Sequence, residues 1–143
     1  MTASSTENSD LSPNKAIDSS SDTRWSSNEK DPQWIKIDLG KIYTIYSVRL
    51  NWEDAFGKKY KIQISKDGSS WKDIYTTSNG DGGIDDIKDL SGKGRYIRMY
   101  GTKRETQWGY SLWDFEVYGK PDTITYENPS SSKSIGRQSR KRN

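Results

Sequence analysis

The residues that could do chemistry in this 143-residue chain are carboxylates, lysines and tyrosines, because the chain contains no histidine and no cysteine. The usual general base, zinc ligand and thiol nucleophile are therefore missing, and no disulfide can form. No GxSxG, phosphate-loop or HExxH motif occurs either. A pair of carboxylates could still hydrolyse a glycoside. Any enzyme hypothesis therefore rests on carboxylates, Lys or Tyr.

Two acidic positions need an explanation. Glu116 lies in the middle of the apolar stretch SLWDFEVYG, which resembles a closing strand, and a carboxylate there needs either a partner or solvent. The other position is the cluster NGDGGIDDIKD, whose glycines and acidic residues tolerate tight turns. This cluster is predicted to be a hairpin turn with solvated charges.

Strict alternation of apolar and polar residues predicts the elements that carry these groups. In WIKIDLG, for example, Ile35, Ile37 and Leu39 share one face of an expected strand. The same pattern recurs in YSVRLNW, YKIQIS, WKDIYTT, RYIRMY and SLWDFEVYG. Turn signals rich in Gly, Asn and Asp lie between these runs, namely DLGK, KDGSS, SNGDGG and SGKG. Short strands at this spacing indicate an antiparallel sandwich or jelly roll.

The composition is polar but rich in rings. Only 29% of residues are hydrophobic and the mean hydropathy is -1.08, yet the chain has six Trp, nine Tyr and two Phe, which disordered chains lack. Five tryptophans in strand-like contexts are expected in the core: Trp25, Trp34, Trp52, Trp71 and Trp113. No apolar run is long enough to span a membrane, and MTASSTENSD has no signal-peptide pattern, so an exported protein would have lost its signal before this start.

Positive charge is concentrated at the C-terminal end. The net charge of +3 is misleading, because residues 120–143 contain six basic and two acidic residues. Residues 1–119 are therefore close to neutral and lack the basic surface of a nucleic-acid-binding domain. The strand pattern also ends near residue 119. The prediction is one domain over residues 1–119, followed by a linker or disordered basic tail over residues 120–143.

Four stretches in a fixed order carry a family resemblance: NKAIDSSSDTRWSS, DPQWIKIDLG, KKYKIQISKDGSSWKDIY and RYIRMYGTKRETQWGYSLWDFEVYG. Across residues 3–119 they resemble the discoidin family, also called the coagulation factor type C domain, and within it the bacterial family 32 carbohydrate-binding modules. The resemblance implies an eight-stranded antiparallel β-sandwich of jelly-roll type with one structural calcium ion. Animal members usually carry a disulfide, so the absence of cysteine favours the bacterial, sugar-binding branch.

The resemblance implies a calcium site that would explain Glu116. Calcium takes six to eight oxygens, which backbone carbonyls supply as well as carboxylates. The implied ligands are the carbonyls of Lys15, Ser20 and Phe115, the side chains of Asp18 and Glu116, and the carbonyl and hydroxyl of Thr23. The ion would then join the last strand to an early loop. The alternative is an Asx-type turn at Asp18 and Thr23, with Glu116 in solvent.

A sugar-binding site needs an aromatic platform beside fixed polar groups, on loops rather than on core positions. Arg24 is a candidate donor fork for vicinal hydroxyls, and Glu53 and Asp54 are candidate acceptors where a strand ends. Trp108 and Tyr110 flank a glycine on a polar loop and are the expected stacking platform, although Tyr110 could also pack inward. Glu7 and Glu29 would complete the rim.

The expected function is that of a secreted bacterial module without catalytic activity. It would bring an attached glycoside hydrolase to its polysaccharide, as a monomer, with no nucleic-acid or membrane partner. The resemblance points to β-linked mannan or chitosan, and mannose, galactose and glucosamine all remain open. The alternative function is membrane-lipid or cell-surface adhesion, with Phe56 and Trp108 as apolar spikes at loop tips.

Overall fold

The computed structural model describes residues 1–17, 22–122 and 133–134, and most of its regular structure is antiparallel β-strand. The strands are β1 (Thr2–Ala3), β2 (Trp25–Ser26), β3 (Gln33–Trp52), β4 (Gly57–Ser65), β5 (Lys72–Thr77), β6 (Ile84–Ile87), β7 (Gly92–Arg104), β8 (Ser111–Pro121) and β9 (Lys133–Ser134). Two 3₁₀ helices lie between β1 and β2, η1 (Ser9–Leu11) and η2 (Pro13–Ala16). Among the described residues, no helix has the length and apolar character needed to cross a membrane.

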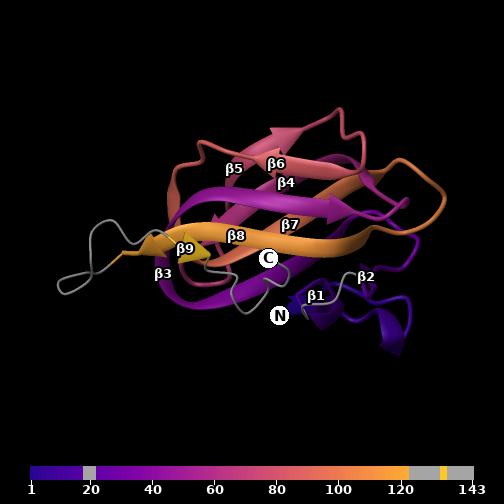
Figure 1. Cartoon of the computed structure of the whole chain (residues 1–143), viewed down its shortest axis with the longest axis horizontal. Helices are drawn as coiled ribbons and strands as arrows, with labels where there is room; N and C mark the ends of the chain where they lie inside the picture. Colours follow the sequence, from indigo (N-terminus) through magenta and orange to yellow (C-terminus); the bar gives the residue numbers. More distant parts are fainter. Residues whose placement is uncertain (18–21, 123–132, 135–143) are drawn as a thin grey trace.

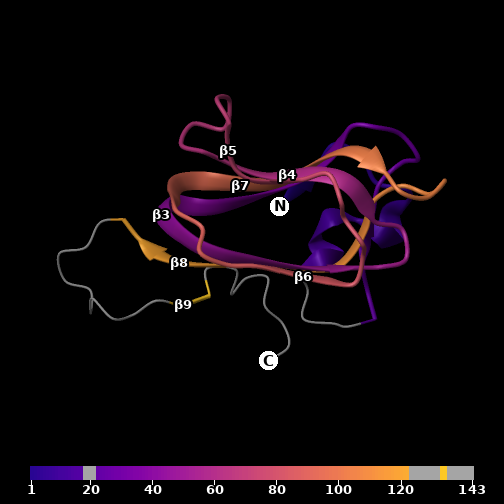
Figure 2. The ribbon, with the colours of Figure 1, turned by 90° about the horizontal axis from the view of Figure 1, so that it is seen from above.

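The long strand β3 belongs to both layers of a sandwich. Residues 33–38 pair with β7 and residues 47–52 pair with β8, while β6 pairs with β3 over residues 48–51. Strands β1, β7, β4 and β5 extend the first layer, and β2, β8 and β6 form the second. Figure 2 shows the two layers edge-on, with β3 turning from one to the other. The predicted antiparallel sandwich is confirmed, and the short β9 pairs with β8 in addition.

The stretch DLGK is a bend inside β3, and its interpretation as a turn between two strands is wrong. Gly40 has φ +89°, and its N–H donates to Oδ1 of Asp38 at 2.8 Å. The pairing register with β7 shifts between Asp38 and Tyr43. The chain therefore changes direction without reversing, because β7 and β8 pair with the strand on either side of the bend.

The core lies between the two layers. Ile35, Ile37 and Leu39 are buried, as the alternation predicts, and so are Trp25 and Trp52. Trp34, Trp71 and Trp113 are only half-buried, so their assignment to the core is wrong. Trp34 alternates with the inward-facing isoleucines of β3 and must therefore point away from the core.

The cluster NGDGGIDDIKD does not form the predicted hairpin. Strand β5 pairs with β4 in the first layer, whereas β6 pairs with β3 in the second, so the segment between them crosses the open side of the sandwich. Its charges are also not all solvated. Oδ2 of Asp85 accepts a hydrogen bond from Nε1 of Trp52 at 3.0 Å and another from the Tyr60 hydroxyl. Desolvation and Asp85 together raise the pKa of Tyr60.

The predicted KDGSS turn does connect neighbouring strands, and one carboxylate closes it. Oδ1 of Asp67 accepts from the N–H groups of Ser69 at 2.8 Å and Ser70 at 2.9 Å, and from the hydroxyl of Ser65 at 3.0 Å. These hydrogen bonds stabilise the charged form and lower the pKa of Asp67 from its usual 3.8. Such a group stabilises the fold above its unfolded pKa, and the stabilisation is lost as pH falls through the folded pKa.

The substitution Asp67→Ala is therefore expected to lower Tm by a nearly constant amount between about pH 7 and pH 5, where the carboxylate is charged in both states. Below about pH 4 the difference from the parent should shrink, because the parent loses the same interaction by protonation. Thermal unfolding followed by circular dichroism at several pH values measures this. A difference that stays equal at about pH 2 would show that the charge is irrelevant to the turn.

The segment after the sandwich is described only in part. Strand β8 continues to Pro121, two residues beyond the predicted end of the domain, and Tyr118 and Gly119 pair with β9. The remainder of the predicted linker or tail, residues 123–132 and 135–143, lies outside the described residues.

Candidate functional site

Three connections meet at one end of the sandwich, on the right in Figures 1 and 2. The β7–β8 connection is bound to the β3–β4 connection, since Glu105 N donates to Phe56 O at 3.1 Å and Ser111 N donates to Ala55 O at 2.8 Å. The segment after β2 joins them through Ser27 N and Tyr110 O, 2.8 Å apart. Backbone hydrogen bonds therefore fix these loops to one another.

Ser111, the first residue of β8, organises two of the predicted ligand residues. Its hydroxyl accepts from Nη1 of Arg24 at 2.7 Å and donates to the carbonyl of Trp25 at 3.0 Å. Its carbonyl accepts from the N–H of Glu53 at 2.9 Å. Nothing in the sequence pattern singled out Ser111, because its role depends on β2 and β3 both lying beside β8.

Arg24 also lies over the ring of Trp113, one of the tryptophans that the strand pattern predicts in the core. Its Cζ atom is 5.9 Å from the ring centroid of Trp113, which is half-exposed. Pairing of β3 with β8 passes from Asn51↔Asp114 to Trp52↔Leu112, so Trp113 is an extra residue in a bulge. A bulge changes which side a residue faces, and simple alternation cannot detect it.

Glu53 and Glu7 are held in place by short local contacts. Oε1 of Glu53 accepts from the N–H of Ala55 at 3.0 Å. Oε1 of Glu7 accepts from the hydroxyl of Ser26 at 3.0 Å, and the backbone N–H of Glu7 donates to the carbonyl of Ser26 at 2.8 Å. Ser26 pairs with Ser111 across β2 and β8. Glu7, Arg24 and Glu53 are thus attached to two adjacent serines.

The remaining carboxylates and Trp108 are open to solvent. Glu29 follows β2 and Asp54 follows Glu53, and both are exposed. Trp108 is 53% exposed, a large fraction for an indole, and its backbone N–H donates to Oγ1 of Thr106 at 3.1 Å. At the next residue, a Cβ on Gly109 would lie 2.3 Å from the carbonyl oxygen of Ser27. Only glycine lets the loop that carries Trp108 approach the segment after β2 so closely.

Tyr110 is fully buried, so its predicted role as part of the stacking platform is wrong. Its hydroxyl donates to Oδ1 of Asp31, and burial together with this carboxylate raises the pKa of the phenol. Asp31 in turn forms an ion pair with Arg104, with Nε and Oδ2 3.2 Å apart. Tyr110 therefore fixes the β7–β8 loop to the core, and Trp108 is the exposed aromatic ring of that loop.

Phe56 cannot act as a spike at a loop tip. Its side chain is partly buried and packs against the core cluster. A Cβ on Gly82 would lie 2.9 Å from Phe56 Cδ1, so the ring also contacts the β5–β6 connection. Trp108 is then the one remaining candidate spike of the two that the lipid hypothesis named.

The proposed calcium ligands are only partly described. Asp18 and Ser20 lie outside the described residues. Among the others, the Thr23 hydroxyl is 3.4 Å from the carbonyl oxygen of Lys15, which brings two of the expected oxygens together. Glu116 is only 8% exposed on β8, the strand against which η2 packs, and its Oε1 accepts from the Tyr118 hydroxyl. Lys15 and Thr23 therefore supply two neighbouring oxygens, and the calcium site stays a prediction.

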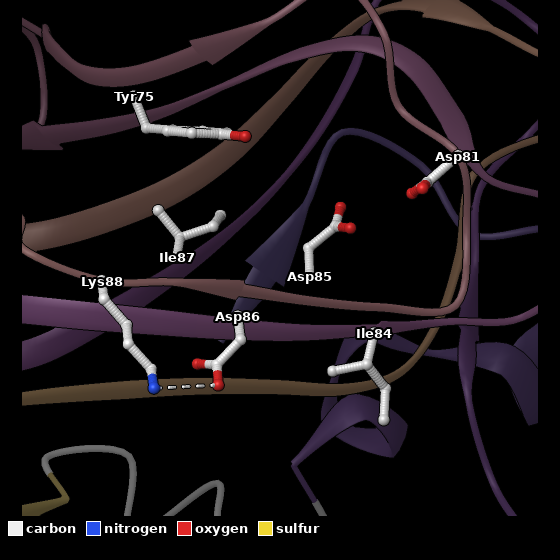
Figure 3. Close-up of a pocket in the computed structure, with 7 residues that line it drawn as sticks. All are labelled: Tyr75, Asp81, Ile84, Asp85, Asp86, Ile87 and Lys88. Carbon is white, nitrogen blue, oxygen red and sulfur yellow. Dashed lines mark ion pairs between the residues drawn. The ribbon is translucent and has the colours of Figure 1, made fainter.

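A separate acidic pocket of 370 Å³ opens between β5 and β6, at the side of the sandwich. It is lined by Tyr75, Asp81, Ile84, Asp85, Asp86, Ile87 and Lys88. In Figure 3, Asp85 and Ile87 rise toward Tyr75, while Asp86 lies on the opposite side with Lys88, 3.7 Å away. One of the pocket's three carboxylates, that of Asp85, is already used in hydrogen bonds from Trp52 and Tyr60.

The sandwich is similar to solved structures of chitosan-binding modules. Chitosan-binding module 1 of a chitosanase/glucanase from Paenibacillus sp. IK-5 is 49% identical, with a TM-score of 0.79, over 82% of this chain and 92% of that one. Module 2 of the same enzyme, solved with chitotriose, is 45% identical, with a TM-score of 0.77, over 80% and 92%.

Sequence comparison finds a relative in a second type of enzyme. A polysaccharide lyase 8 family protein, HylA, from Enterococcus faecalis (strain ATCC 700802 / V583) is 32% identical over 114 residues, or 74% of this chain. The match spans only 8% of that protein's length. The family model for the F5/8 type C domain matches residues 1–133.

Proposed function

The chain belongs to the F5/8 type C domain family, and from that premise we propose that it is a carbohydrate-binding module for glucosamine-containing polysaccharide of the chitosan type. The observation that carries the proposal is the grouping of Arg24 and Glu53 on Ser111, at the end of the sandwich that also exposes Trp108. An indole platform beside a fixed donor and acceptors is what a pyranose ring and its hydroxyls require.

The preference for glucosamine is proposed from charge. Four carboxylates, those of Glu7, Glu29, Glu53 and Asp54, belong to the predicted rim, and an ammonium group on the sugar would pair with them. Two related modules that are 45% and 49% identical are named for binding chitosan. A mannan ligand would lack the positive charge that these carboxylates complement.

In this proposal the module performs no chemistry of its own. It raises the effective concentration of an attached, secreted polysaccharide-degrading enzyme at its substrate. The related modules come from a chitosanase/glucanase, which supports this arrangement. The competing lipid hypothesis is weaker after the burial of Phe56, because one indole supplies little apolar area for membrane insertion.

The proposed calcium ion would be part of the scaffold rather than of the sugar site. Lys15, Thr23, Phe115 and Glu116 would hold it, together with Asp18 and Ser20. When bound, the ion would supply positive charge beside the buried carboxylate of Glu116 and so connect η2 to β8.

The proposal predicts that Trp108→Ala weakens binding of glucosamine oligomers at least tenfold, or about 1.4 kcal/mol, because the stacking platform is removed. Calorimetric titration with a glucosamine trimer or hexamer should give a Kd between about 1 mM and 1 µM for the parent. Stability should change by less than about 0.5 kcal/mol, since Trp108 is exposed. Arg24→Gln is expected to weaken binding in the same way.

Ile84→Ala is the matched control, because Ile84 is the other large, exposed apolar side chain among the described residues and lines the acidic pocket instead. It should leave affinity unchanged. If Ile84→Ala abolishes binding and Trp108→Ala does not, the ligand occupies the pocket and the proposed site is wrong. N-acetylated trimers should bind more weakly than glucosamine trimers, and equal binding of mannan oligomers would refute the charge argument.

A further inference from the structure

The outer face of the first layer carries rings and cations on β3 and β7, outside the loops of the proposed sugar site. In cross-strand register Trp34 lies opposite Tyr100, and Lys36 lies opposite Arg98. Across the next pair, Gln63 lies opposite Arg98. Directly opposed residues share a face, and the residues between them point into the core. We call Trp34, Lys36, Trp71, Tyr96, Arg98 and Tyr100 the aromatic–basic face.

Two like charges are directly opposed on this face. Positive charges at paired positions of neighbouring strands are destabilising, so Lys36 and Arg98 need compensation. Rings supply part of it: Cζ of Arg98 is 4.0 Å from the ring centroid of Trp71 and 4.7 Å from that of Tyr100. Nζ of Lys36 is 5.4 Å from the ring centroid of Trp34.

Within the described part of the chain, no carboxylate lies within 4.0 Å of either cation. Arg98 Nε donates to Oε1 of Gln63 at 2.8 Å. Gln63 in turn donates to the carboxylate of Asp73 at 2.7 Å, and Asp73 is already paired with Lys61 at 3.2 Å. Burial without a countercharge lowers the pKa of Arg98. Arg98 is thus a partly desolvated cation, and within the described residues no side chain accepts a hydrogen bond from its Nη groups.

We propose that the aromatic–basic face is a second ligand surface, which binds a carboxylate-bearing polysaccharide strand lying across β3 and β7. A sugar carboxylate can take both Nη groups of Arg98 in the bidentate geometry that a guanidinium favours, and Lys36 lies on the adjacent strand to share the charge. The ring edges around them would contact the apolar faces of the neighbouring sugars. This surface would therefore select acidic polymers, whereas the loop site presents carboxylates of its own.

The arrangement of the rings favours an acidic sugar over a nucleic acid. Bases bind proteins by stacking on open aromatic faces. Here the cations lie over the faces of Trp71, Tyr100 and Tyr96, with Arg95 Cζ 5.2 Å from the ring centroid of Tyr96. The face therefore presents mainly hydrogen-bond donors to a ligand, rather than open ring surfaces for stacking. The aromatic–basic face belongs to the layer that contains β4 and β7 in Figure 2.

The test is titration of the full chain with a galacturonate hexamer at low salt, with Lys36→Gln and Arg98→Gln as variants. Each is expected to raise Kd at least fivefold, and Arg98→Lys should do the same because it loses the bidentate fork. The matched control is Lys88→Gln, which removes one positive charge just after β6, in the other layer. The Lys88 side chain is 69% exposed there. The basic residues of 120–143 are present in every variant, so they contribute equally.

The outcomes separate this proposal from the loop site. Trp108→Ala should still bind galacturonate like the parent, so either proposal can fail alone. Equal losses in Lys36→Gln and Lys88→Gln would mean that only net charge matters, and the proposal would be wrong. If Arg98→Gln unfolds, Lys36→Gln decides the question. Equally tight binding of a single-stranded DNA of the same charge, lost in the same variants, would overturn the assignment to sugar.

Discussion

Tyr110→Ala is expected to lower the free energy of unfolding by about 3–5 kcal/mol, the usual cost of truncating a fully buried aromatic side chain. The ring is 0% exposed and fills the space that two glycines leave. A Cβ on Gly101 would lie 2.2 Å from Tyr110 Cε2, and one on Gly57 would lie 3.2 Å from the same atom. Neither backbone can move in to close the cavity without breaking its strand pairs. Urea denaturation followed by far-ultraviolet circular dichroism measures the loss.

Tyr110→Phe is the matched control for this experiment. It keeps the ring and removes the hydroxyl that donates to Asp31, so its cost should be nearer about 1 kcal/mol. Asp31 still has its ion pair with Arg104. Gly101→Ala should destabilise the parent by about 1–3 kcal/mol or more, and less in a Tyr110→Ala background, because the clash then disappears. If Tyr110→Ala is stable but no longer binds sugar, Tyr110 belongs to the ligand site.

Removal of the proposed calcium ion is expected to have the second large effect. If the ion is present at about one hundred times its Kd, chelation should cost about 2.7 kcal/mol and lower Tm by on the order of 10 °C. The physical reason is that Glu116 would remain as a buried negative charge once the ion had gone, and η2 would lose its connection to β8. Differential scanning calorimetry with and without EDTA measures the shift.

Glu116→Gln tells calcium loss apart from a general effect of the chelator. This variant should start with a lower Tm than the parent, and EDTA should change it much less. Sugar affinity should be nearly the same in the parent with and without EDTA at a temperature where both are folded, because the ion would lie in the scaffold. A parent Tm that EDTA leaves unchanged would contradict the calcium site.

Local patterns predicted the strands well because burial on one side of a strand is recorded at every second residue. Ile35, Ile37 and Leu39 are buried as expected, and the KDGSS turn is where the sequence placed it. The same local signals failed at DLGK and at NGDGGIDDIKD. Glycine and aspartate show that the backbone can bend, but the partner strands decide whether it bends, reverses or crosses to the other layer.

The candidate site divides in the same way. Residue types and loop positions predicted Arg24, Glu53 and Trp108 as binding residues, and their role in binding stays a prediction, although they lie on connections that meet at one end of the sandwich. They were insufficient for Tyr110 and Trp113, which are both aromatic, close in sequence and polar in context. A backbone bulge leaves Trp113 half-exposed beside Arg24, and the space above Gly101 takes Tyr110 inside.

The sequence by itself therefore determined the antiparallel sandwich, its family and the kinds of side chain available for binding. Only the tertiary structure decided which of those side chains reach solvent together, as Ser111 shows by joining Arg24 to Glu53. The same holds for the opposed cations Lys36 and Arg98, which are 62 positions apart in the chain and meet only through strand register. Burial leaves a periodic mark on a sequence, whereas the contact between two distant segments depends on pairing that no single segment contains.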